Sequence, residues 1–148
     1  MCLILGQRRR LTARVIVVVF AVLVVAACGE SGPVASGRVI VVNARDFHLS
    51  VGGEARVRAG VVTFAVRNTG AARHELLVAR PLTRLPLRRD GVTVNEEQLI
   101  HSHFDGTDPV EPGGTASLRV RLVPGHYVLF CNMAGHYLGG MHQALVVV

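Results

Sequence analysis

The chain has 148 residues, of which 50% are hydrophobic, and carries a formal net charge of +6. Four of the 16 basic residues, and none of the 10 acidic ones, lie in residues 1–27, so the rest of the chain carries 12 − 10 = +2. The basic balance is therefore mostly an export signal and gives no reason to expect nucleic-acid binding. Without that signal, 148 − 27 = 121 residues remain, a length that suits one domain.

Residues 1–27 are expected to be a signal peptide. Arginines precede an unbroken apolar run of 13 residues from Val15 to Ala27, too short for a membrane-spanning helix of about 20 residues. The run ends in Val-Ala-Ala-Cys28, which resembles the lipobox of bacterial lipoproteins and implies that Cys28 carries a lipid. In the alternative interpretation the signal is cut elsewhere and Cys28 is an ordinary thiol. With Cys2 in the signal and Cys28 lipidated, Cys131 has no disulfide partner and is either a buried thiol or a ligand.

Residues 28–37 have the composition of a flexible linker, and residues 38–148 show the periodicity of strands. Apolar residues alternate with polar ones in three stretches, around Val57, from Val62 to Val66 and from Ala116 to Leu122. Pro124-Gly125 predicts a turn before a strand from Tyr127 to Cys131, and the final run from Ala144 to Val148 predicts a strand buried on both faces. Short strands separated by Gly and Pro predict an all-β antiparallel sandwich.

Residues 81–114 interrupt this pattern. They contain four prolines, and the stretch from Val94 to Ile100 could form a short helix. We expect a long, partly irregular or helical connection across one edge of the sandwich.

The chemistry lies in the stretch from Tyr127 to Met141. Cys131 ends a predicted strand, and His136 and Met141 follow on a Gly-rich loop that returns to the last strand. Two imidazoles, a thiolate and a weak axial thioether are a copper ligand set, whereas a thioether is a poor ligand for zinc. The loop supplies one histidine, so a second is needed upstream, and His74 after a predicted turn is the candidate.

The order His74, long gap, Cys131, His136, Met141 before the final strand resembles the cupredoxin family, including plastocyanin, azurin and sulfocyanin-like proteins, over about residues 38–148. The resemblance implies a Greek-key β-sandwich that binds one type 1 copper ion, with His74, Cys131 and His136 as strong ligands and Met141 as the axial one. Many cupredoxins have Asn after the first histidine, but this chain has Glu75, so hydrogen bonding at the site is expected to differ. The competing interpretation makes these four side chains ordinary core residues.

The ligand loop has no formally charged residue other than histidine. It predicts an apolar docking patch around His136, formed by Met133, Ala134, Tyr137 and Leu138. Alternatively, Tyr137 and Leu138 fold inward and cap the metal.

The remaining histidines are assigned no role in this site. His101 and His103 could bind a second ion, although a solvated loop is the simpler expectation. His126 is also left without a role, and His142 should point away from the metal if the last strand has begun there.

The expected function is one-electron transfer by a monomer tethered outside the cytoplasmic membrane through its lipid, with redox proteins at that surface as partners. No general base or second metal site is evident in the sequence, which argues against an enzyme. The alternative is an extracytoplasmic module that binds copper for delivery or storage.

Overall fold

The computed structural model describes residues 37–52, 56–81 and 84–148. The predicted signal peptide, Cys28 and all of the predicted linker except Gly37 lie outside these ranges. No helix within the described ranges is long and apolar enough to cross a membrane.

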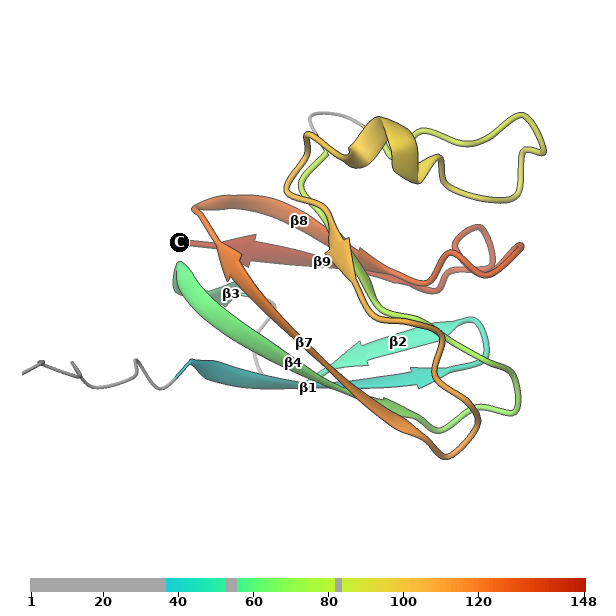
Figure 1. Cartoon of the computed structure of the whole chain (residues 1–148), viewed down its shortest axis with the longest axis horizontal. Coiled ribbons are helices and arrows are strands. Elements are labelled where there is room, and N and C mark those ends of the chain that lie inside the picture. Colours follow the sequence, from blue (N-terminus) through green and yellow to red (C-terminus); the bar gives the residue numbers. More distant parts are fainter. Residues whose placement is uncertain (1–36, 53–55, 82–83) are drawn as a thin grey trace, which may run out of the picture. The chain divides into compact units, whose positions relative to one another are not determined.

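Two β-sheets make up the fold (Figure 1). The first has the strand order β2-β1-β4-β7, and the second has the order β3-β9-β8-β5-β6. The first sheet consists of β1 (Arg38–Arg45), β2 (His48–Val51), β4 (Gly60–Asn68) and β7 (Thr115–Leu122). The second consists of β3 (Arg56–Val57), β5 (Leu77–Ala79), β6 (Asp105–Gly106), β8 (Gly125–Phe130) and β9 (His142–Val147). The predicted β-sandwich is confirmed.

The sheets are mixed, which refines the expected antiparallel pattern. β1 pairs with β4 in parallel, and β3 pairs with β9 in parallel, while the other strand pairs are antiparallel. After the β1–β2 hairpin the chain crosses to the second sheet as β3 before it returns as β4. This crossing lets β4 enter the first sheet in the same direction as β1, as parallel neighbours require.

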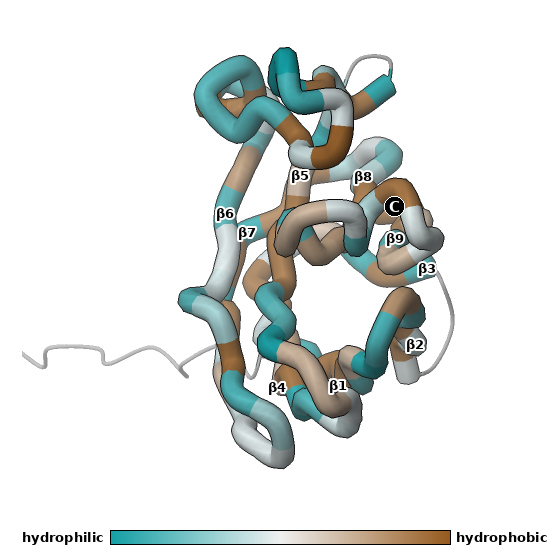
Figure 2. The backbone as a smooth tube through the Cα atoms, turned by 90° about the vertical axis from the view of Figure 1, so that its right-hand side faces the viewer, coloured by the Kyte–Doolittle hydropathy of each residue, from teal (hydrophilic) through white to brown (hydrophobic). Residues whose placement is uncertain are grey.

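Alternating side chains from the two sheets form the main core. On β4, Val62, Phe64 and Val66 are buried as predicted, and the hydrophobic stretches of β1, β4 and β8 are brown in Figure 2. The prediction that the last strand is buried on both faces is wrong, because Leu145 and Val147 are buried whereas Ala144 is exposed. Small apolar residues on an uncovered sheet face are tolerated at the surface.

Within the described residues 84–114, the connection is mostly irregular, as expected. It holds one 3₁₀ helix, η1 (Glu96–Leu99), within the stretch predicted to be a short helix, and also the short strand β6. A second apolar cluster fixes the connection beside β8: Leu85, Val94 and Leu99 are buried with Phe130. The connection therefore covers the end of β8 from which the ligand loop starts (Figure 1).

Candidate metal centre

Three predicted ligands converge at one end of the sandwich. Cys131 directly follows β8, His136 lies in the loop between β8 and β9, and His74 precedes β5. The backbone of His74 is fixed by a bridge to Val110, with the amide of each residue donating to the carbonyl of the other. The ligand atoms of His74, Cys131 and His136 all lie within 4.8 Å of one another.

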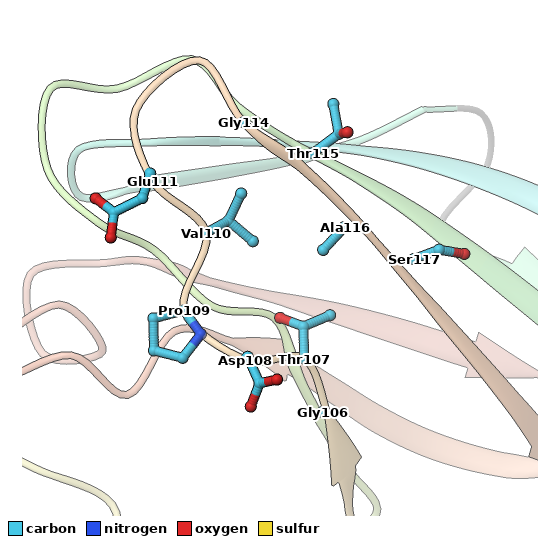
Figure 3. Close-up of a pocket in the computed structure, with 10 residues that line it drawn as sticks. All are labelled: Gly106, Thr107, Asp108, Pro109, Val110, Glu111, Gly114, Thr115, Ala116 and Ser117. Carbon is cyan, nitrogen blue, oxygen red and sulfur yellow. The ribbon is translucent and has the colours of Figure 1, made fainter.

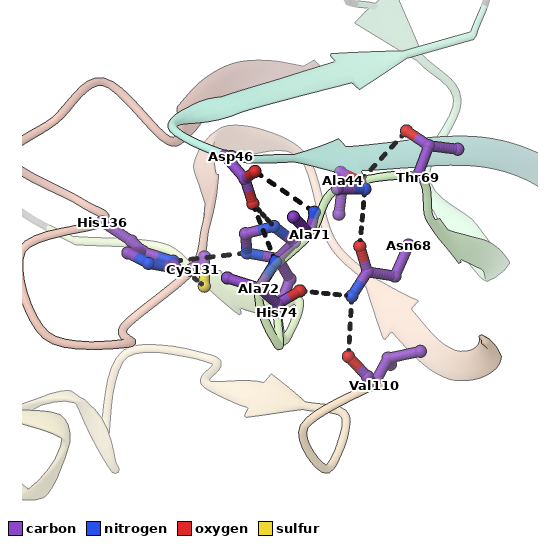
Figure 4. A network of polar contacts seen from close by, with 11 residues as sticks. Ala44, Asp46, Asn68, Thr69, Ala71, Ala72, His74, Val110, Cys131 and His136 are labelled. Carbon is purple, nitrogen blue, oxygen red and sulfur yellow. Dashed lines mark hydrogen bonds and ion pairs between the residues drawn. The ribbon is translucent and has the colours of Figure 1, made fainter. Parts of the chain in front are cut away.

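The donor atoms face each other directly (Figure 4). Nδ1 of His74 is 3.3 Å from Nδ1 of His136, which is 3.4 Å from Sγ of Cys131. His74 and Cys131 are fully buried, whereas His136 is half-buried. Two ring nitrogens and a sulfur gathered this closely form a donor set that suits a cation.

The surroundings affect the protonation of two of these groups in opposite directions. Burial raises the pKa of the Cys131 thiol. The thiol therefore keeps its proton until a bound cation displaces it. The pKa of His136 is lowered, first by burial and then by the neighbouring His74, which keeps its imidazole neutral and able to donate a lone pair. Metal binding is therefore expected to release a proton from the thiol.

Met141 lies beside the other three residues in the fold. It is fully buried in the same core cluster as Cys131. Its carbonyl accepts a hydrogen bond from the Cys131 amide at 3.1 Å, and its own amide donates to the His136 carbonyl at 2.9 Å. The loop thus closes on itself next to the three donors. Gly135 and Gly140, with φ of 79° and 101°, adopt the left-handed backbone that its turns require.

Glu75 occupies the position after the first histidine and joins the two halves of the site. Its carboxylate accepts a hydrogen bond from the amide of Asn132, the residue after Cys131, at 3.1 Å. Burial raises the pKa of Glu75, while this hydrogen bond opposes the rise. The expected difference in hydrogen bonding is therefore a link between the His74 segment and the start of the ligand loop.

Asn132 in turn attaches the ligand loop to the long connection. Its side chain accepts a hydrogen bond from the Val94 amide and donates to the Val94 carbonyl and to the Glu96 carboxylate. These contacts position the residue next to Cys131.

Sequence reasoning missed two residues of the turn between β1 and β2. Asp46 Oδ1 lies 3.0 Å from Nε2 of His74, and the Phe47 ring meets the His136 ring edge to face at a centroid distance of 5.2 Å. The pKa of Asp46 is lowered, mainly by hydrogen bonds from the amides of Ala72 and Ala71. No motif in the sequence connects this turn with the predicted metal ligands.

The predicted patch residues surround His136 with unequal exposure. Leu138 is 54% exposed and Ala134 is exposed, whereas Met133 packs against the core and Tyr137 packs against Phe130. Leu138 thus points outward, and Tyr137 is only partly turned inward. A groove beside the loop is lined by Arg84, Leu85, Leu87, Tyr137, Leu138 and His142.

The other histidines lie outside the three-donor cluster. His101, His103 and His126 are exposed. His142 is also exposed and begins β9, where its ring contacts that of Tyr137.

A hollow separate from this groove is lined by residues from β6 to β7, including Val110 (Figure 3). Its acidic lining residues are Asp108 and Glu111, and Glu111 is paired with Arg73 at 2.8 Å. Within the described ranges, the only group of three or more potential metal-ligating side chains found is the one at His74, Cys131 and His136. We assign no role to this hollow.

Comparisons with known proteins place the fold. No protein-family model matches the chain, and no curated protein matches it. Among solved structures, it is similar to reduced auracyanin from Roseiflexus castenholzii, with 17% identity, 76% of this chain and 98% of that chain covered, and a TM-score of 0.53. Rusticyanin from Thiobacillus ferrooxidans shows 19% identity, coverage of 76% and 79%, and a TM-score of 0.56. Auracyanin A from Chloroflexus aurantiacus, described as a "blue" copper protein, shows 16% identity, coverage of 76% and 99%, and a TM-score of 0.51. The chain therefore has the cupredoxin fold.

Proposed function

We propose that this chain is a type 1 copper protein that transfers single electrons between redox partners. One observation carries the proposal: the donor atoms of His74, Cys131 and His136 gather within 4.8 Å at the end of a cupredoxin fold. The similar auracyanin A is described as a copper protein, which supports the same metal here.

The donor set favours copper over other metals. A thiolate and two imidazoles with a weak axial thioether suit copper, and Met141 is the residue proposed as that axial ligand. Copper held in this set would supply one-electron chemistry between Cu(I) and Cu(II).

The protein would hold its donors in nearly the same positions in both oxidation states. His74 is fixed by its backbone bridge to Val110, and Cys131 by the hydrogen bonds around Asn132 and Met141. Donors that are already in place need little rearrangement when the charge of the metal changes. This restraint favours electron transfer over catalysis, and we propose no enzymatic step.

His136 is the proposed exit for electrons. It is half-buried, whereas His74 and Cys131 have no exposed surface. The predicted docking patch around it, with the neighbouring groove and Arg84 at the groove, would receive redox partner proteins in brief encounters. We propose that the chain acts there as a monomer.

We further propose that the protein works outside the cytoplasm, attached to a membrane by a lipid on Cys28. The support is the Val-Ala-Ala-Cys28 sequence after an apolar run and the linker-like composition of residues 28–37. The linker would hold the copper domain away from the lipid surface.

Copper delivery or storage is the competing function, and redox cycling in the presence of a chelator separates the two. The full chain is loaded with Cu(II), reduced with ascorbate, reoxidised, and exposed throughout to a Cu(I)-selective chelator. We expect a reversible one-electron couple and copper that stays bound over repeated cycles. Rapid loss of copper to the chelator on reduction would support delivery instead.

A further inference from the structure

The turn between β1 and β2 contacts both histidines of the site. β1 ends at Arg45, β2 begins at His48, and these two residues are paired, so the turn consists of Asp46 and Phe47 alone. We propose that Asp46 and Phe47 form a clamp that positions the two histidine ligands, Asp46 acting on His74 and Phe47 on His136. This inference rests on the proposed copper site.

Asp46 determines how the buried histidine faces the other donors. Its Oδ1 lies 3.0 Å from Nε2 of His74, at the opposite side of the ring from Nδ1, the atom nearest His136. An ionised carboxylate can accept hydrogen bonds but cannot donate them. This contact therefore places the proton of a neutral His74 on Nε2 and leaves the Nδ1 lone pair for a metal. Such outer contacts fix ring orientation and raise the basicity of a ligand.

Asp46 is itself held in place by the segment that carries His74. The amides of Ala72 and Ala71 donate to its two oxygens at 3.1 and 3.2 Å. These two hydrogen bonds direct the carboxylate at the ring, although the Asp46 side chain is 39% exposed.

Gly70 shows how closely this contact is enclosed. A Cβ atom at Gly70 would lie 2.6 Å from Oδ1 of Asp46 and 2.7 Å from Nε2 of His74. The φ angle of Gly70 is outside the left-handed region, so its backbone does not require glycine. A side chain is excluded at Gly70 because there is no room for it next to the Asp46–His74 contact.

Phe47 supplies the second contact at a conformational cost. Its φ is 56°, a left-handed value that is unfavourable for a bulky residue. Its ring meets the His136 ring at an interplanar angle of 65°, and a Cβ added at Gly139 of the ligand loop would collide with that ring. Strain at one residue that is repaid by a contact with a site residue is typical of functional positions.

The clamp is tested by the histidine tautomers of the metal-free chain and by the reduction potential of the copper-loaded chain. In the metal-free full chain, ¹⁵N NMR of the histidine rings should show the proton of neutral His74 on Nε2. Asp46→Ala should produce a mixture of the two ring tautomers. Gly70→Ala should do the same although the carboxylate remains, because the new methyl group separates the two side chains. Asp105→Asn, which removes one exposed negative charge from β6, is the matched control.

In the copper-loaded chain, Asp46→Asn keeps an oxygen acceptor but loses the charge. It should weaken Cu(II) binding relative to Cu(I) by about tenfold, a rise in reduction potential of about 59 mV for a one-electron couple. Asp105→Asn should leave the potential close to that of the unaltered chain.

Phe47→Gly relieves the left-handed strain and removes the ring. It should leave folding stability unchanged or raised while the His136 ring resonances broaden or split. A Phe47→Gly chain with unchanged His136 resonances would overturn that half of the clamp.

Two results would overturn the proposed action of Asp46 on His74. One is an unchanged His74 tautomer in both Asp46→Ala and Gly70→Ala, and the other is an equal reduction potential for Asp46→Asn and Asp105→Asn. A chain that binds no copper but shows the expected tautomer changes would refute the proposed function and leave the clamp intact.

Discussion

Asn132→Ala should loosen the attachment between the ligand loop and the long connection. Val94 is fully buried, and both its amide and its carbonyl bond to the Asn132 side chain, at 2.5 and 3.0 Å. Leaving each buried backbone group without a partner costs about 1–3 kcal/mol, or about 2–6 kcal/mol for the pair. Because water can replace part of these contacts, we expect the free energy of unfolding to fall by about 2–4 kcal/mol.

Asn95→Ala is the matched control for this loss. Asn95 is the neighbour of Val94, and its side-chain oxygen is buried without a hydrogen-bond partner in the described part of the chain. Urea unfolding of the metal-free full chain, followed by circular dichroism, gives the free energy of unfolding for each variant. Equal free energies of unfolding for the Asn132→Ala and Asn95→Ala chains, within about 0.5 kcal/mol, would refute the reasoning, because only Asn132→Ala removes the hydrogen bonds to Val94.

Three further substitutions test individual assignments. Met141→Leu should keep the fold and the visible colour but raise the reduction potential, measured by voltammetry, because it removes a weak donor that favours Cu(II); an unchanged or lower potential would contradict an axial role. Leu138→Asp should slow bimolecular electron transfer in stopped-flow measurements with the spectrum and potential nearly unchanged, and an undiminished rate would show that electrons leave elsewhere. Cys28→Ser should abolish incorporation of a labelled fatty acid, and an unlabelled parent chain would refute the lipid anchor.

The strand pattern and the cluster of donors could be anticipated for local reasons. Alternation in β4 follows from burial of one face, so Val62, Phe64 and Val66 were predictable from their spacing of two. Cys131 and His136 lie five positions apart on one loop. A copper site needs a second histidine, and this requirement points to His74 upstream.

Features that depend on distant pairing could not be anticipated. Asp46 reaches His74 across 28 positions, and nothing in the local sequence of a two-residue turn indicates that contact. The parallel pairing of β1 with β4 depends on the route of the chain through the other sheet. Ala144 on β9 is exposed, and an apolar sequence such as Ala144 to Val148 does not reveal that one face of the strand reaches solvent.

The visible absorption spectrum of the Cu(II)-loaded chain, compared with that of Cys131→Ser, tests the copper assignment most directly. A thiolate bound to Cu(II) gives an intense charge-transfer band, and a neutral serine hydroxyl cannot replace it. The unaltered chain should therefore show the band with one copper ion bound, and Cys131→Ser should lack it and lose most of its Cu(II) affinity. An unaltered chain without the band, or a Cys131→Ser chain that retains it, would contradict a copper centre built on Cys131.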